Sequence, residues 1–115
     1  MSSEFITGDA RTKLVQLTIN DATFIIAPTS TVTAQIISKD RLKVLTTEPV
    51  ECLSTMTGAV WTTSLVAVKF PRASTAGIKV IGAAVLEIQV TVDPDGDAED
   101  FSFFTPITIA KGNLP

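Results

Sequence analysis

The sequence predicts an all-β protein, and the architecture we expect is an Ig-like antiparallel β-sandwich of about seven strands. The first reason is composition, because 17 Thr, 11 Val and 11 Ile together make up 39 of the 115 residues. Branching at Cβ restricts a side chain in a helix but packs well on a pleated sheet. The second reason is that short alternating segments are separated by turn-forming residues roughly every 8 to 12 positions, which is typical of a two-sheet sandwich. A small β-barrel or a jelly roll is the alternative, because sequence alone does not set strand pairing.

The first half of the chain contains five short segments that we expect to be strands. The clearest is 31–37, in which Val32, Ala34 and Ile36 alternate with polar residues, as in a strand with one face in water. A tight connection at 38–41 then leads into a hairpin partner. The expected strands of this half are 12–19, 22–27 (stopped by Pro28), 31–37, 42–47 and 50–53, followed by a loop at 54–58.

The second half contains the most regular pattern in the chain. Within 79–92, the even positions from Leu86 to Val92 are apolar and the odd positions between them are polar, which predicts a long strand with one covered face. Gly82, near its start, indicates a bulge or a close approach of two backbones. The other elements that we expect here are a strand at 60–70 ended by Pro71, a single helical turn at 72–77, a turn at 93–97 and a return strand at 101–109.

Size and hydropathy predict one folded domain over residues 1–115, with 1–10 and 111–115 as extended tails. A chain of 12.2 kDa buries about two thirds of its surface on folding. Hydrophobic residues make up 45% and charged residues 18% of the chain, which excludes intrinsic disorder. No apolar run approaches the roughly 18 residues needed to cross a bilayer, and the acidic start at 1–9 is not typical of a secretory signal. We therefore expect no membrane partner.

The residue types that are missing exclude several classes of function. The chain has no His, no Tyr and a single Cys, so it can form neither an internal disulfide nor a Cys/His zinc site. Catalytic triads that use imidazole as the base are excluded as well. A net charge of −3 and a pI near 4.7 argue against nucleic-acid binding, which needs a basic face. We expect no enzyme, no cofactor and no small-molecule substrate.

One acidic stretch is a candidate metal site. Its members are Asp93, Asp95, Asp97, Glu99 and Asp100. Carboxylates spaced around a glycine can converge on Ca²⁺, but in an EF-hand loop the glycine is sixth and a Glu is twelfth. Counted from Asp93, Gly96 is fourth and the twelfth residue is Phe104. We therefore expect a solvated hairpin turn and no metal ligands, with a calcium-stabilised binding module as an alternative.

The remaining candidates for chemistry have structural interpretations. Cys52 has no His to lower its pKa, so we expect a small core residue. Trp61, where a loop enters a strand, is expected to cover the end of the sandwich core, and contact with a partner subunit is the alternative. No spacing among the other carboxylates indicates acid–base catalysis, so no catalytic residue is assigned. These carboxylates are Glu4, Asp9, Asp21, Asp40, Glu48, Glu51 and Glu87.

Three parts of the chain, taken together, carry a resemblance to a known family. They are residues 5–9 (FITGD), residues 58–61 (GAVW) with 66–71 (VAVKFP) and 73–77 (ASTAG), and residues 82–91 (GAAVLEIQVT). Their order and spacing resemble the sandwich domain at the N-terminus of phage upper baseplate proteins, over roughly residues 5–110. After the acidic turn, where the family has an aromatic such as Trp, this chain has Phe101, Phe103 and Phe104.

The resemblance implies a non-enzymatic structural protein in the virion of a tailed bacteriophage, assembled in the host cytoplasm. We expect a stand-alone subunit that joins tail, baseplate or fibre components, with other phage structural proteins as partners. Because phage tails present symmetric sites, a homo-oligomer is expected. A return strand at 101–109 and extended termini would add to neighbouring subunits by edge pairing. A capsid cement, decoration or neck protein is the alternative.

Overall fold

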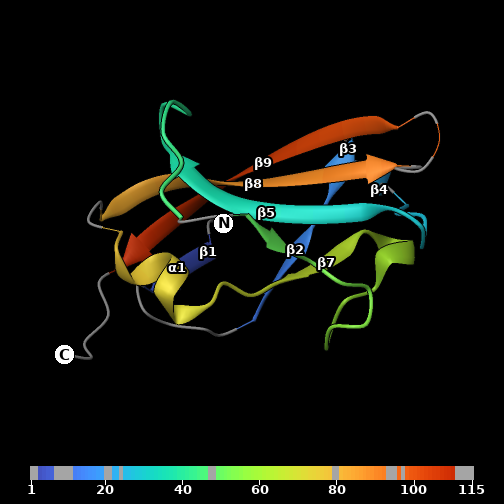
Figure 1. Ribbon diagram of the computed structural model, residues 1–115, viewed down its shortest axis with the longest axis horizontal. Helices are drawn as coiled ribbons and strands as arrows, with labels where there is room; N and C mark the ends of the chain where they lie inside the picture. The colour runs from blue at the N-terminus through green and yellow to red at the C-terminus, as the bar shows by residue number, and fades with distance from the viewer. Residues whose placement is uncertain are drawn as a thin grey trace.

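The computed structural model confirms the all-β class and describes residues 3–6, 12–19, 22–23, 25–46, 49–78, 81–92, 96 and 98–110. Its strands form a sandwich-like arrangement of two layers (Figure 1) and close no barrel within these residues. One layer is a five-stranded sheet in the order β1-β9-β8-β5-β6. The other contains the β2–β7 pair, and the short β3–β4 hairpin forms a further two-stranded sheet.

The large sheet is built around three long strands. They are β5 (Thr31–Ser38), β8 (Gly82–Val92) and β9 (Glu99–Ala110). The β8–β9 pair is antiparallel over the whole length of β8, from Gly82 opposite Ile109 to Val92 opposite Glu99. At the edges lie β6 (Val50–Glu51) and β1 (Ser3–Ile6), and β1 pairs with β9 in parallel. Residues 3–6, expected within an extended tail, are therefore part of the sheet.

The second layer covers one face of this sheet. It contains β2 (Lys13–Gln16) and β7 (Leu65–Val68), which pair in antiparallel register, and it continues into β3 (Thr18–Ile19) and β4 (Ala22–Thr23). Alternation along the strands directs one set of side chains between the layers. The largest fully buried side chains include Leu17, Ile26, Ile36, Leu86, Ile88, Ile107 and Ile109.

Two of the long strands that we expected are interrupted, and the interruptions face each other. The expected strand 12–19 breaks at Leu17, which is buried and whose N–H donates to the Ser64 carbonyl at 3.0 Å. The expected strand 60–70 begins with a 3₁₀ turn, η1 (Trp61–Thr63), and Ser64 adopts a left-handed φ of 63° before β7 starts. The turn places the Trp61 ring in the core, a tertiary contact that overrides the local strand preference.

Other boundaries differ in smaller ways. The expected strand 22–27 ends at Thr23, and Ile26 instead donates its N–H to the Trp61 carbonyl at 3.1 Å. Residues 42–46 of the expected strand 42–47 pair with β5 through a bridge at Val44 rather than a full strand. The helical turn is confirmed as α1 (Arg72–Ala76), and β9 begins two residues before the expected start at 101.

At Gly82 the sequence indicates a bulge or a close approach of two backbones, and the structure shows a positive φ there with no close approach. Its φ is +111°, and a Cβ added there would meet nothing within 4 Å. The left-handed conformation, and no close approach of a second backbone, therefore explains the glycine.

Candidate binding surface

The outer face of the β5–β8–β9 sheet is the main candidate for a functional surface. Register places Gln35, Glu87 and Phe104 in one row across the three strands, on the side away from the second layer. Neighbouring rows contain Thr31, Thr91 and Asp100, then Thr33, Gln89 and Ser102, and finally Ile37, Val85 and Pro106. Polar residues therefore occupy one part of this face and apolar residues the other.

The polar part is held by hydrogen bonds between neighbouring strands. The Gln35 Nε2 donates to Glu87 Oε1 at 2.5 Å, and the Thr91 hydroxyl donates to Asp100 Oδ1 at 2.7 Å. Cross-strand pairs of this kind stabilise a sheet and fix side-chain positions. This part of the face is thus an ordered polar surface.

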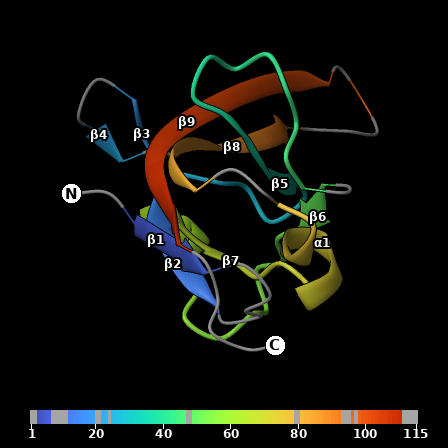
Figure 2. The same ribbon diagram turned by 90° about the vertical axis from the view of Figure 1, so that its left-hand side faces the viewer.

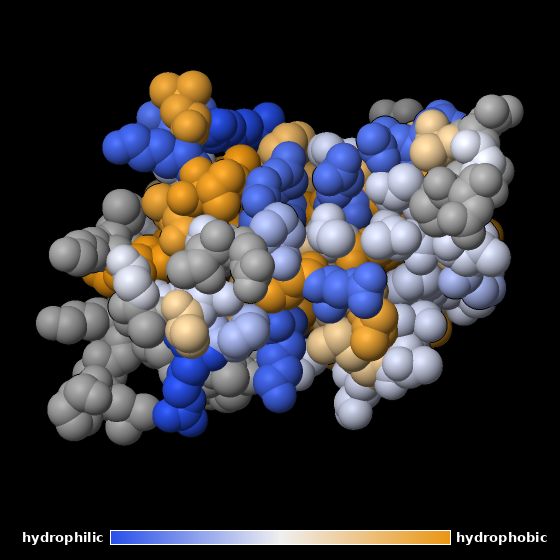
Figure 3. Space-filling view, viewed as in Figure 1, coloured by the Kyte–Doolittle hydropathy of each residue, from blue (hydrophilic) through white to orange (hydrophobic). Residues whose placement is uncertain are grey.

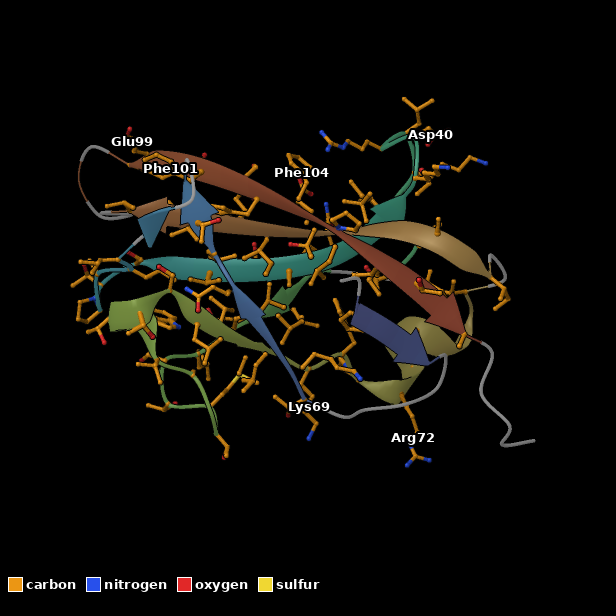
Figure 4. The ribbon with its side chains drawn as sticks, turned by 180° about the vertical axis from the view of Figure 1, so that it is seen from behind. Asp40, Lys69, Arg72, Glu99, Phe101 and Phe104 are labelled. Atoms are coloured by element: carbon orange, nitrogen blue, oxygen red, sulfur yellow. The ribbon has the colours of Figure 1, made fainter. Side chains whose placement is uncertain are left out.

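A loop formed by residues 39–44, which we call the basic loop, rises beside the apolar part of the same face (Figure 2). Its Arg41 guanidinium lies over the Phe104 ring, 4.1 Å from the centroid, a distance at which a cation and a ring attract each other. Figure 4 shows Asp40 and Phe104 on the same side of the sheet. The loop therefore reaches across β8 and covers part of β9.

The conformation of the basic loop is defined by local hydrogen bonds. The Asp40 carboxylate accepts from the Ser38 hydroxyl and from the Leu42 N–H, the latter at 3.0 Å. The Ser38 hydroxyl in turn accepts from the Lys43 N–H at 3.1 Å, and Arg41 turns the chain with a left-handed φ of 64°. The Ser38 hydrogen bond, with a smaller contribution from the Leu42 N–H, holds the pKa of Asp40 below its ordinary 3.8. These hydrogen bonds hold the basic loop in one conformation, with its side chains exposed to solvent.

Apolar side chains are exposed on and beside the basic loop. Leu42 is 81% exposed, Val44 53% and Phe104 39%, whereas Ile37 and Val85 beneath them are buried. The space-filling view shows hydrophobic and hydrophilic residues side by side at this corner of the molecule (Figure 3). Exposed apolar side chains that gather in one place are typical of protein contact sites.

The structure separates the candidate residues of the sequence analysis. Asp93, Asp95 and Asp97 lie outside the described residues, as do Asp9, Asp21 and Glu48. Glu99 and Asp100 are exposed at the start of β9. The other described carboxylates lie on separate elements, with Glu4 on β1, Asp40 in the basic loop, Glu51 on β6 and Glu87 on β8. Among the described residues, no group of three or more Cys, Asp or Glu is arranged to hold a metal ion.

Cys52 and Trp61 both lie in the core. Cys52 is 1% exposed, and its N–H donates to the Val32 carbonyl of β5 at 2.8 Å. Burial, with a smaller contribution from the charge of Glu51, raises the pKa of the Cys52 thiol to about 12, which keeps it protonated and unreactive. The Trp61 indole N–H is buried, and no described residue accepts a hydrogen bond from it. Neither side chain presents a reactive atom at the surface.

The surface described above was missed in part by the sequence analysis. Residues 38–41 were interpreted as a tight connection, although the run Lys39-Asp40-Arg41-Leu42-Lys43 places one Leu among four charged residues. That run was the available signal for an exposed apolar side chain. The contact between Arg41 and Phe104 had no local signal, since it depends on the register of three strands.

Comparisons with known proteins add no relative. Searches against protein-family models, curated proteins and solved structures each found no match for this chain. No helix among the described residues has the length and apolar content that crossing a membrane requires.

Proposed function

We propose that this chain is a non-enzymatic structural subunit of a tailed-phage virion, an adaptor of tail, baseplate or fibre that acts by binding other proteins. The observation that carries the proposal is the outer face of the large sheet, where Leu42, Val44 and Phe104 are exposed beside an ordered polar surface. Such a combination of apolar side chains and fixed polar groups is typical of protein interfaces.

The virion setting comes from the three stretches that resemble upper baseplate proteins. Two of them meet in the core, because the rings of Phe5 and Phe70 pack edge to face with centroids 5.9 Å apart. The third forms β8, the strand at the centre of the large sheet. These stretches therefore build much of the scaffold, and the third also supplies Glu87 and Gln89 of the outer face.

Analysis of purified particles tests the proposal. Particles from cells that produce the chain should contain it in a fixed ratio to the other structural proteins, and labelled antibody should locate it on the tail or baseplate. Label at capsomer junctions would select the decoration role instead. Absence of the chain from purified particles would contradict a virion role altogether.

A pair of matched variants tests the surface itself. Leu42→Asp places a charge in the exposed apolar group, whereas Ile25→Asp makes the same kind of change at another highly exposed position, 70% exposed. If the outer face binds the neighbouring protein, Leu42→Asp lowers incorporation about tenfold or more, and Ile25→Asp leaves it unchanged. Equal effects of the two variants would exclude the outer face.

A further inference from the structure

Two apolar side chains of the outer face are buried although they lie on the side away from the second layer. Register places Ile37, Val85 and Pro106 in one row across β5, β8 and β9. Ile37 is 5% exposed and Val85 9%, yet neither belongs to the main core cluster. An uncovered outer face of a sheet leaves its side chains in water. This row is therefore covered from the outer side.

The basic loop provides the cover. It leaves the end of β5, and β8 lies between β5 and β9 in the sheet. The Arg41 guanidinium nevertheless lies 4.1 Å from the centroid of the Phe104 ring on β9. The Arg41 side chain therefore passes over β8, where Val85 and Glu87 are neighbouring outer-face positions. Figure 2 shows the loop on this side of the sheet.

The backbone of Arg41 has a conformation that disfavours arginine. Its φ of 64° lies in the left-handed region, which Gly, Asn and Asp adopt more readily than other residues. Residues held in such a conformation are fixed by several contacts around them. Here the hydrogen bond from the Leu42 N–H to Asp40 fixes the turn, and the Phe104 ring holds the side chain. The side-chain contact therefore accounts for an arginine where the backbone favours another residue type.

We propose that Arg41 and Phe104 form a clasp that keeps the basic loop folded over the outer face. While the guanidinium lies on the ring, Ile37 and Val85 stay covered, and its release uncovers them. Phe104 is 39% exposed, and a cation–ring contact at an exposed site gains free energy of the same order as the backbone conformation costs. The closed and open forms are therefore close in free energy. The clasp goes beyond the proposed function, because it is a property of the free chain whatever the outer face binds.

Labelling of a cysteine beneath the loop measures the opening. In a Val85→Cys chain the new thiol lies in the covered row, whereas the native Cys52, which is 1% exposed, lies in the core. Iodoacetamide modifies a thiol only when the thiol is uncovered, so the rate at position 85 reports release of the clasp. The rate at Cys52 reports opening of the core. Mass spectrometry of peptides from the labelled chain gives both rates.

Two variants of the Val85→Cys chain break the clasp. Phe104→Leu keeps an apolar side chain but removes the ring, and Arg41→Asn removes the guanidinium while suiting the left-handed backbone better. Each should raise the labelling rate at position 85 about two- to fivefold, the factor that corresponds to a cation–ring contact at the surface, with the rate at Cys52 unchanged. If Arg41 served only to form the turn, Arg41→Asn would leave the rate at position 85 unchanged or lower it.

Two controls separate the ring contact from charge alone. Lys39→Asn makes the same change of charge at another exposed position of the basic loop. Glu87→Gln removes the charge of the carboxylate in the same row as Phe104 and keeps an oxygen that can accept from Gln35 Nε2. Each control should label at position 85 more slowly than the Phe104→Leu variant, because the ring still holds the guanidinium.

Three results would overturn the inference. They are labelling at position 85 of the Val85→Cys chain as fast as that of a fully exposed cysteine, clasp variants that label no faster than this parent chain, and a control that labels as fast as the Phe104→Leu variant. If Phe104→Leu raises labelling at Cys52 as well, it opens the core, and Arg41→Asn, which changes only an exposed loop residue, decides the outcome.

Discussion

The β8–β9 hairpin and the segment between β5 and β7 differ in how their backbones are held. β8 and β9 pair without interruption along eleven positions. Between β5 and β7, the described residues form only the two-residue strand β6, the 3₁₀ turn η1 and isolated bridges at Val44 and Val60. The chain is equally rich in β-branched residues in both regions, so composition alone does not decide which of them becomes a regular strand.

The two regions also differ in where their apolar side chains lie. Four of the eight large apolar side chains that the described part of the chain exposes lie in the irregular segment, namely Leu42, Val44, Leu53 and Val60. β8 exposes none of them and β9 only Phe104. A regular hairpin buries its apolar side chains against the second layer, whereas an irregular segment can project them into solvent. We infer that the hairpin supplies the scaffold and the polar part of the candidate surface, whereas the irregular segment supplies the exposed Leu42 and Val44.

The largest expected difference in stability comes from making the same Leu→Ala substitution in each of the two regions. Leu86 in β8 is 0% exposed, whereas Leu42 in the basic loop is 81% exposed. Leu86→Ala should lower the free energy of unfolding by about 2 to 5 kcal/mol, because it leaves a cavity in the core. Leu42→Ala should change it by less than about 0.5 kcal/mol. Urea unfolding at neutral pH measures both, and comparable losses would contradict the division between scaffold and surface.

A smaller effect is expected at Gly82 of the hairpin, where the backbone conformation favours glycine. Gly82→Ala adds a Cβ to a backbone with a φ of +111°, and this Cβ would contact no neighbour within 4 Å. The expected loss in the free energy of unfolding, about 1 to 3 kcal/mol, therefore comes from the backbone conformation alone. Gly77→Ala is the control, because Gly77 has a φ of −84° and equally open space. That change should be neutral or stabilise by up to about 1 kcal/mol. Equal unfolding midpoints for the two variants would show that the backbone at Gly82 relaxes freely.

The regular elements could be predicted because their information is local. The alternation in β5 and β8 and the turn residues before β9 lie within a few positions of each other, and Pro71 directly precedes α1. The interruptions at Leu17 and at Trp61–Thr63 could not be predicted in this way. They exist because the Leu17 N–H bonds to the Ser64 carbonyl and because the Trp61 ring enters the core, and no local pattern encodes either contact.

The candidate surface could be predicted only in part, for the same reason. The polar positions Glu87, Gln89 and Thr91 follow from alternation, which assigns them to the face away from the core. The stacking of Arg41 on Phe104 requires the pairing of β8 with both β5 and β9. Contacts between distant segments are set by register, and register was not fixed by the sequence pattern.

The smallest expected effect tests Cys52, one of the residues that anchor the irregular segment in the core. Burial raises the pKa of Cys52 to about 12 from an ordinary 9.0. Between these values the unfolded chain loses the thiol proton and the folded chain keeps it, so stability falls as the pH rises above about 9. At pH 10 the loss relative to pH 8 should be about 1 kcal/mol. Cys52→Ala should lack this part of the decrease, while every other titrating group contributes equally to both proteins. Parallel urea titrations at the two pH values measure the difference.

Identical decreases for the native chain and the variant, together with rapid labelling of Cys52 by a thiol reagent under native conditions, would show that this segment opens readily instead of being fixed against β5.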